Sequence, residues 1–414
     1  MSKSPPPKTF TPDKSQNVYQ QSLALHRHHQ GKLETVSKVK LKTREDLALF
    51  YTPGVAEPSR AIARDKSLSF QLTMRGRTIA VISDGSAVLG LGNIGPEAAM
   101  PVMEGKSLLL KEFGGVDSVP IVINTQDPNQ IIDFVKTIAP TFAGINLEDI
   151  AAPACFAVEE ALQNIGIPVF HDDQHGTAIV VRAALINAAR VVAKPFDQLK
   201  VVIVGAGSAG LATAKMLLGI NCSGNSCSKI PGVKAVADVI VCDRQGALVV
   251  GRDKMNLYKQ AVAALSNKRH KKGQLNQVIK GADVVIGLSG PGSITPDMVK
   301  SMARRAIVFA MANPTPEIMP AEAIEAGAYV VATGRSDFPN QINNVLAFPG
   351  VFKAVIQGHL TQITPAMKIR ASDALARVIA KPSRKQIIPD PFTTNLSQII
   401  AEAILAPESS KTKE

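Results

Sequence analysis

An apolar run that leads directly into a glycine-rich turn and then into a helix constrains this chain more than any other feature. The run covers residues 201–204, and the helical stretch after the turn covers 211–218. A second β-branched run, 239–241, comes later and is followed by Asp243. The order strand, turn, helix, strand and acid is the fingerprint of a βαβ unit that binds a dinucleotide. The turn itself consists of Gly205, Ala206, Gly207, Ser208, Ala209 and Gly210.

The turn also predicts how a cofactor would be held. Its glycines allow a tight bend and let the backbone approach a pyrophosphate, which the free N–H groups and dipole of a helix N-terminus stabilise. Asp243 can accept hydrogen bonds from the ribose hydroxyls of NAD, whereas Arg244 beside it can pair with the 2′-phosphate of NADP. We therefore expect NAD or NADP, with the preference open. The polar segment 221–232 is expected to form an added loop.

Short β-branched runs alternate with Ala- and Leu-rich helical stretches along most of the chain. Such alternation is typical of parallel βα units, so the expected fold class is α/β. The strand candidates are residues 78–82, 119–123, 201–204, 239–241, 284–286, 307–309 and 329–331.

A long helix, predicted from about residue 176 to 192, precedes the glycine turn and suggests a hinge between two domains. We expect an N-terminal α/β domain, residues 1–175, and then a Rossmann-type doubly wound dinucleotide-binding domain with C-terminal helices, residues 176–406. Segments 1–14 and 407–414 are predicted to be flexible tails.

Composition narrows the class of protein and its surroundings. The 414 residues are 45% hydrophobic, which suits two or three globular cores. No apolar run approaches the ~18–20 residues that cross a bilayer, and the N-terminal segment lacks the apolar core of a signal peptide. We therefore expect a cytoplasmic protein without a membrane partner.

The cysteines argue against a disulfide-stabilised or zinc-binding protein, and the distribution of charge argues against a nucleic-acid-binding one. Four cysteines are too few for a disulfide framework and are not spaced as zinc ligands, so we expect reduced thiols, with Cys222 and Cys227 as ordinary loop residues. The net charge of +12 admits nucleic acid or polyanionic metabolites. However, the densest basic run, 268–272, suits a helix C-terminus, and the chain has no Trp for stacking. We expect no nucleic-acid partner.

Two pairs of acidic residues follow predicted strands in the N-terminal half. Glu148 and Asp149 come after an Ile-Asn-Leu run, and Asp172 and Asp173 come after Pro-Val-Phe-His. Carboxylates crowded in strand-end loops repel one another unless a cation offsets them, and an oxygen-rich set suits Mg²⁺ or Mn²⁺. Each pair alone is more often a helix cap.

Other polar residues stay ambiguous when they are read without further context. His171 and His175 could join a mixed metal site but are more often hydrogen-bonding scaffold. A second GxGxxG sequence, 90–95, is interpreted as a loop of the first domain that serves either as a bare turn or as a ligand contact. Tyr51 and Lys106 would be a boundary aromatic residue and a solvated lysine.

An ordered set of motifs resembles the malic enzymes, and most closely their short bacterial type. The first is Tyr-Thr-Pro-Gly-Val at 51–55, followed by Asp-Gly-Ser-Ala-Val-Leu-Gly-Leu-Gly-Asn-Ile-Gly at 84–95 and Gly-Lys at 105–106. Asn-Leu-Glu-Asp stands at 146–149 and His-Asp-Asp-Gln-His-Gly-Thr at 171–177. Ala-Asn-Pro-Thr-Pro-Glu at 312–317 and a long motif at 334–344 extend the match over most of the chain.

The resemblance implies a role for each matching residue and makes the N-terminal domain the substrate and metal domain. It implies a homodimer and no acyltransferase-like second module. Larger family members carry a substrate-binding arginine where this chain has Ala87, so what replaces that cation is open. The implied roles are general acid for Tyr51, general base for Lys106, ligands of Mg²⁺ or Mn²⁺ for Glu148, Asp149 and Asp173, and contacts to substrate or nicotinamide for Asp172, Asn313 and Asn344.

The predicted reaction is the oxidation of L-malate to pyruvate and CO₂ with reduction of NAD or NADP. Lys106, with its pKa lowered by burial and by the metal, would accept the hydroxyl proton, and Tyr51 would protonate the carbon that CO₂ leaves. Three alternatives stay open: a malolactic-type enzyme that makes lactate, a non-decarboxylating 2-hydroxy-acid dehydrogenase, and a non-catalytic dinucleotide-binding sensor.

Overall fold

The computed structural model describes residue 10 and residues 17–88, 90–224 and 226–407. The predicted tails 1–14 and 407–414 therefore lie outside the described residues, except for Phe10 and Pro407. In the described ranges no helix is long and apolar enough to span a membrane.

A four-stranded parallel sheet forms the centre of the N-terminal half, with the strand order β2-β1-β3-β4. All six residues of β1 are buried, as expected of a strand covered by helices on both faces. The strands are β1 (Thr78–Ser83), β2 (Asp117–Val122), β3 (Gly144–Leu147) and β4 (Val169–His171). The helices and helical turns around it are η1 (Lys66–Leu68), α4 (Ser69–Leu72), η2 (Met74–Arg77), α5 (Pro96–Leu109), η3 (Leu110–Gly114), α6 (Pro128–Ile138), η4 (Ala139–Thr141) and α7 (Ala154–Ala161).

A six-stranded sheet forms the second half, in the order β12-β11-β10-β5-β8-β9, with only β9 antiparallel. From β5 the chain moves to β8 on one side and then to β10 on the other, so the strand order reverses at β5, where doubly wound folds bind ligands. The strands are β5 (Lys200–Val204), β8 (Asp238–Asp243), β9 (Gly246–Ala247), β10 (Val284–Gly287), β11 (Ile307–Ala310) and β12 (Val330–Thr333). The helical elements beside it are η5 (Phe196–Gln198), α9 (Ser208–Leu218), α10 (Leu257–Leu265), α11 (Leu275–Val278), α12 (Pro296–Lys300), α13 (Pro320–Glu325) and η6 (Asn344–Leu346).

These sheets confirm the α/β class and the Rossmann-type second half. All seven predicted strands are present, as β1, β2, β5, β8, β10, β11 and β12. They were predictable because strands buried on both faces are continuous β-branched runs.

Helix α8 (Asp172–Val191) joins the two sheets, and most of its 20 residues are buried. The helix begins four residues earlier than the sequence pattern indicates. Asp172 and Asp173 therefore lie in its first turn instead of in a strand-end loop. Negative charge is stabilised at this end of a helix by the peptide dipoles.

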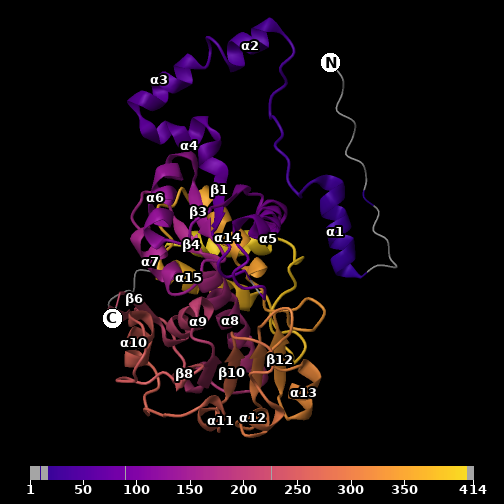
Figure 1. Ribbon diagram of the computed structural model, residues 1–414, viewed down its shortest axis with the longest axis vertical. Coiled ribbons are helices and arrows are strands. Elements are labelled where there is room, and N and C mark those ends of the chain that lie inside the picture. The colour runs from indigo at the N-terminus through magenta and orange to yellow at the C-terminus, as the bar shows by residue number, and fades with distance from the viewer. Residues whose placement is uncertain (1–9, 11–16, 89, 225, 408–414) are drawn as a thin grey trace.

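The C-terminal helices pack back onto the first half of the chain, as Figure 1 shows for the yellow segment. They are α14 (Phe348–Gly358), α15 (Pro365–Arg377) and α16 (Leu396–Leu405). The ring of Phe352 in α14 lies edge-on to that of Phe170 in β4, with 5.8 Å between centroids. Arg182 of α8 forms an ion pair of 2.6 Å with Asp373 of α15. The chain thus returns to its first domain after completing the second.

The N-terminal arm, residues 17–65, is arranged differently. It carries α1 (Val18–His29), α2 (Arg44–Phe50) and α3 (Ala56–Arg64), none of which has a buried residue. Figure 1 shows α2 and α3 extending away from the body of the molecule. Between residues 33 and 65, every hydrogen bond within the described part of the chain stays inside the arm or joins it to the adjacent η1 turn.

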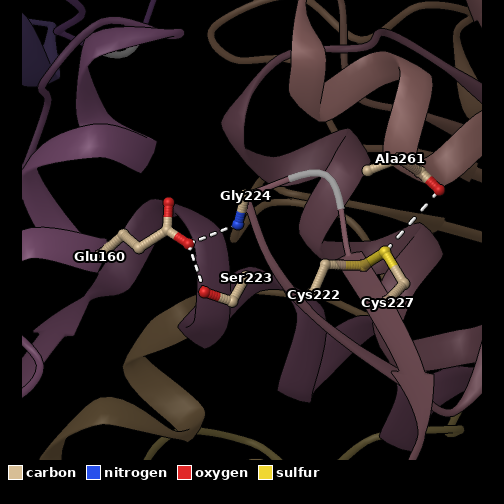
Figure 2. Close-up of a disulfide and its surroundings, with 6 residues drawn as sticks. All are labelled: Glu160, Cys222, Ser223, Gly224, Cys227 and Ala261. Atoms are coloured by element: carbon tan, nitrogen blue, oxygen red, sulfur yellow. Dashed lines mark hydrogen bonds between the residues drawn. A yellow bond between two sulfur atoms is a disulfide. The ribbon is translucent and has the colours of Figure 1, made fainter.

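The segment predicted as a polar loop is a β-hairpin instead, made of β6 (Ile220–Ser223) and β7 (Ser226–Lys229). Cys222 and Cys227 face each other across it and form a disulfide. The expectation of reduced loop thiols is therefore wrong for this pair, because the antiparallel register brings their Cα atoms to 4.0 Å. Figure 2 shows the disulfide and, on the other side of the hairpin, the contact with Glu160.

Candidate active site

Lys106 lies at the centre of an acidic cluster that combines both halves of the chain. It projects from the last turn of α5, and its Nζ is 2.5 Å from Asp172 Oδ2 and 3.1 Å from Glu148 Oε2. The same ammonium lies 4.9 Å from the ring centroid of Phe348, at the start of α14. The side chain is 17% exposed, whereas both carboxylates are fully buried. Lys106 is therefore not the solvated lysine that its sequence context alone would indicate.

The acids are positioned by the ends of β3 and β4. Asn146, the third residue of β3, donates to Glu148 Oε1 at 2.7 Å. The backbone N–H of Asp149 donates to Asp173 Oδ2 at 2.8 Å, and Asp149 adopts φ 55. The two acidic pairs, 24 residues apart in sequence, therefore meet at one sheet edge.

Asp149 Oδ2 and Asp172 Oδ1 are buried without a hydrogen-bond partner among the described residues, and Glu148 Oε2 has only its ion pair with Lys106. Burial, together with the neighbouring carboxylates, raises the pKa of Asp149 to about 8, and it also raises the pKa values of Glu148 and Asp172. Oxygens of this kind suit a hard divalent cation. The side chains of the described residues do not converge on one point as a metal-binding group, so some would have to turn.

The charge state of Lys106 differs from the sequence-based expectation. Burial lowers its pKa, but the charges of Asp172, Glu148 and Asp173 outweigh burial, and the pKa is raised. Lys106 is consequently protonated in this arrangement. It can accept a proton only after it gives up the one that it holds.

Asn344 reaches the cluster from the second half of the chain, whereas Asn313 lies beside the first glycine loop. Asn344 donates from Nδ2 to Asp172 Oδ2 at 2.7 Å, so it faces the cleft as predicted. A Cβ atom on Gly176 would lie 1.8 Å from Asp172 Oδ1, so a larger residue at this position would displace the Asp172 carboxylate. Asn313 lies beside the first glycine loop, since a Cβ on Gly90 would come within 2.4 Å of its carbonyl oxygen. The loop 90–95 therefore contacts the second domain.

The second glycine loop has the geometry of a pyrophosphate site. Gly205 has φ +116, and a Cβ there would lie 2.2 Å from the carbonyl oxygen of Leu288. A Cβ on Gly210 would lie 1.9 Å from the carbonyl oxygen of Gly205, so both glycines allow close packing. Gly207 caps α9 and faces open space, which leaves room for a phosphate at the N–H groups of Ser208 and its neighbours.

Asp243 ends β8 as predicted, but two cations already hold its carboxylate. Arg252 is 2.6 Å from Oδ2 and Lys259 is 2.8 Å from the same oxygen. These hydrogen bonds outweigh burial and lower the pKa of Asp243 to about 2. Arg244 is exposed and has no ion-pair partner within the described ranges.

Tyr51 is not brought to Lys106 by the fold of this chain. It follows α2 on the N-terminal arm, and 65% of the residue is exposed. Neither α2 nor Tyr51 makes a hydrogen bond to the acidic cluster in the part of the chain that the structure describes. The site within one chain thus contains the implied base but not the implied acid.

Two family models match this chain, one for each of its halves. The family model of the malic enzyme N-terminal domain matches residues 30–163, and that of the malic enzyme NAD binding domain matches residues 174–406. The chain belongs to the malic enzyme family. A bifunctional malic/malolactic enzyme of Bacillus subtilis is 50% identical over 94% of this chain and 92% of its own length. An NADP-dependent malic enzyme of Halomonas elongata is 42% identical over 90% and 89%.

A solved structure agrees with this assignment. The crystal structure of the NAD-dependent malic enzyme of Thermotoga maritima is 43% identical and superposes with a TM-score of 0.86 over 92% of this chain and 98% of that one. The chain is thus an NAD(P)-dependent oxidoreductase of the malic enzyme family, as its motifs indicated.

In this malic enzyme three supporting residues received no role from the sequence. Phe348 and Asn146 hold Lys106 and Glu148, as described above. Glu317 is fully buried and accepts hydrogen bonds from the backbone of Ser289 and Ala312, both at 2.9 Å, which braces the loops after β10 and β11. Asn146 and Glu317 did give a signal, since Asn146 begins the motif 146–149 and Glu317 ends the motif 312–317.

Proposed function

We propose that this chain oxidises L-malate to pyruvate and CO₂ with reduction of NAD or NADP. The observation that carries the proposal is the position of Lys106, held between Glu148 and Asp172 and reached by Asn344 from the dinucleotide-binding half. A base placed there can serve a hydroxy acid bound next to the nicotinamide.

The proton path begins with the ammonium of Lys106. Asp172, whose pKa is raised by burial, lies 2.5 Å away and is the nearest acceptor for that proton. Neutral Lys106 then takes the C2 hydroxyl proton of malate while hydride leaves C2 for the nicotinamide. After CO₂ leaves, Tyr51 donates a proton to C3 of the substrate. Asn344 and Asn313 orient the substrate and the nicotinamide.

The acids of the cluster fit Mg²⁺ or Mn²⁺ by their chemistry, because Glu148 and Asp149 each have a buried oxygen that forms no hydrogen bond among the described residues. Glu148, Asp149 and Asp173 would hold the ion, while Asp172 stays with Lys106 and Asn344. A bound ion would act there as a Lewis acid and would stabilise the charge that develops on the substrate as CO₂ leaves. We expect Asp173→Ala to remove metal-dependent turnover and to leave dinucleotide binding, followed by nicotinamide fluorescence, nearly unchanged.

The reaction is tested by supplying malate with NAD or NADP, with and without Mn²⁺, and by identifying the product. Pyruvate with stoichiometric reduced cofactor supports the proposal. Lactate without net reduction would make the chain a malolactic-type enzyme, an activity that the printed name of the Bacillus subtilis relative includes. Oxaloacetate as the final product would indicate a non-decarboxylating dehydrogenase. Binding of cofactor without any turnover would indicate a sensor.

We also propose a homodimer in which Tyr51 acts in the site of the partner copy. The arm has no buried residue in its three helices, and it exposes apolar side chains that a second copy could cover. These are Val18, Tyr19, Leu23, Leu33, Val36, Val39, Leu41, Leu47, Leu49, Phe50, Tyr51 and Val55. One chain has a mass of 43.9 kDa, and light scattering after size exclusion should give twice that mass. A monomer that retains full activity would contradict this proposal.

Two further assignments are proposals. The domains are 1–175 and 176–406, with α8 carrying the boundary near its first turn. The location is the cytoplasm, where a nicotinamide-dependent enzyme meets its cofactor, and cell fractionation tests it. In that compartment the Cys222–Cys227 pair would be exposed to reducing agents.

A further inference from the structure

A cavity of about 280 Å³ lies between the two halves of the chain and is separate from the acidic cluster. Its walls come from α7, the first turn of α8, α9, α10, α15 and the hairpin β6–β7. None of Lys106, Glu148, Asp149, Asp172 and Asp173 lines it. The mechanism proposed above does not use this space.

Two lysines of the cavity wall have no counterion in direct contact with them among the described residues. Lys215 of α9 and Lys368 of α15 form neither a hydrogen bond nor an ion pair within the described ranges. Their ammonium groups lie near aromatic rings instead, at 5.8 Å from the centroid of Phe156 and 6.0 Å from that of Phe170. Burial lowers the pKa of both, and that of Lys368 falls to about 8. Two poorly hydrated ammonium groups on one cavity favour an anion there.

The glutamates of the same wall are already engaged. Glu159 accepts a hydrogen bond from Gln174 Nε2 at 2.9 Å and lies 2.6 Å from His175 Nε2. Glu160, at the end of α7, accepts hydrogen bonds from the Ser223 hydroxyl and the Gly224 backbone N–H on the hairpin, as Figure 2 shows. Both carboxylates are therefore held by other groups, although the charge of Glu159 still acts on both ammonium groups.

We propose that this cavity binds a small organic carboxylate, whose charged end pairs with Lys215 and Lys368 and whose apolar part packs on Phe156 and Tyr258. The rings of Phe156 and Tyr258 have centroids 4.6 Å apart and provide the apolar surface. A singly charged carboxylate suits the site better than a doubly charged phosphate, because Glu159 and Glu160 bring negative charge to the same wall. This site is independent of the proposed reaction.

Calorimetric titration of the full-length protein with benzoate tests the site. We expect benzoate to bind wild type and Lys106→Ala with the same affinity, because Lys106 does not line the cavity. Lys368→Met and Lys215→Met should each weaken binding about tenfold or more, the usual effect of losing a charge-assisted hydrogen bond. Lys368→Arg should retain binding. Lys136→Met, which removes an exposed lysine of α6 and the same charge, is the matched control.

Four outcomes would overturn the proposal. They are no benzoate binding up to about 10 mM, equal affinity of wild type and both Met variants, loss of binding in Lys106→Ala, and tighter binding of inorganic phosphate than of benzoate. The thermal unfolding of each variant is measured first. If Lys368→Met does not fold, Lys215→Met and Lys368→Arg still decide the result.

Discussion

Lys106 and Tyr51, the two residues that the malic enzyme motifs assign to proton transfer, occupy opposite surroundings. Lys106 is 17% exposed and lies within 3.1 Å of two buried carboxylates. Tyr51 is 65% exposed, on an arm whose helices bury no residue. The core of a single chain fixes the first residue but not the second. One chain therefore brings the proposed base, but not the proposed acid, to the acidic cluster.

The largest effects are expected from removing either member of the pair. Lys106→Ala should block hydride transfer in both directions, because it removes the proposed acceptor of the C2 hydroxyl proton. Tyr51→Phe should slow pyruvate formation by ~10²–10⁴-fold, the usual contribution of a general acid, and should preserve oxaloacetate reduction better. Nicotinamide absorbance with malate and with oxaloacetate measures both reactions. Equal loss of the two reactions in Tyr51→Phe would make this tyrosine a positioning residue.

Mixing the two inactive variants decides whether the pair is formed between chains. If Tyr51 serves the partner's site, a hybrid of Lys106→Ala and Tyr51→Phe chains has one site with both native residues and one with neither. Random exchange of equal amounts should then restore about a quarter of wild-type activity, since half of the dimers are hybrids with one working site each. If the pair lies within one chain, both sites of every hybrid are defective. No recovery above the separate variants would place Tyr51 with its own Lys106.

The hairpin extends the comparison to a second surface segment, which differs from the arm in being cross-linked and bound to Glu160. Closing its short loop should stabilise the fold by about 2 kcal/mol in the loop-entropy estimate. The double variant Cys222→Ser, Cys227→Ser should lower the melting temperature, and a reductant should lower that of wild type by a similar amount. The variant itself should not respond to reductant. An unchanged melting temperature of reduced wild type would mean that Glu160 alone holds the hairpin.

The smallest effect concerns cofactor preference. It depends on two adjacent residues, Asp243, which is ion-paired, and Arg244, which is exposed. Arg252 and Lys259 occupy the carboxylate of Asp243, while Arg244 stays exposed and unpaired among the described residues. Arg244→Ala should therefore weaken NADP about tenfold, near the low end for an exposed charge-assisted contact, and NAD much less. Michaelis constants for both cofactors measure this, with Arg304→Ala as the control. Equal changes for NAD and NADP would remove Arg244 from phosphate recognition.

The fold was predictable where burial dictates the residue type. Strands β1, β5 and β10 are rich in β-branched residues because they are buried in the sheets. The loop 205–210 is rich in glycine because backbone carbonyl oxygens lie where the Cβ atoms of Gly205 and Gly210 would be. The start of α8 was not predictable, because an acidic first turn followed by Gly176 looks like a loop. The hairpin was missed for a similar reason, since β6 and β7 are mostly exposed and carry polar residues without alternation.

The acidic cluster was predictable in its members but not in its charges. The motifs named Lys106, Glu148 and Asp172, whereas the raised pKa of Lys106 depends on how closely these groups approach after folding. The separation of Tyr51 from Lys106 was also beyond the sequence. Motifs specify which residues act together, and they do not specify whether those residues belong to the same copy of the chain.

Helix α8 connects the acidic cluster to the dinucleotide loop. It carries Asp172 and Asp173 at its first turn and packs along α9, whose N-terminus is the dinucleotide loop. Through α8 these two acids are connected to the cofactor loop, although they lie before the proposed domain boundary at residue 175, whereas Glu148 and Asp149 follow β3. A hinge motion between α8 and β3 would break the hydrogen bond of 2.8 Å that the backbone N–H of Asp149 donates to Asp173 Oδ2. A metal ion bound by Asp173 together with Glu148 and Asp149 would therefore stabilise the arrangement in which α8 and the end of β3 lie close together.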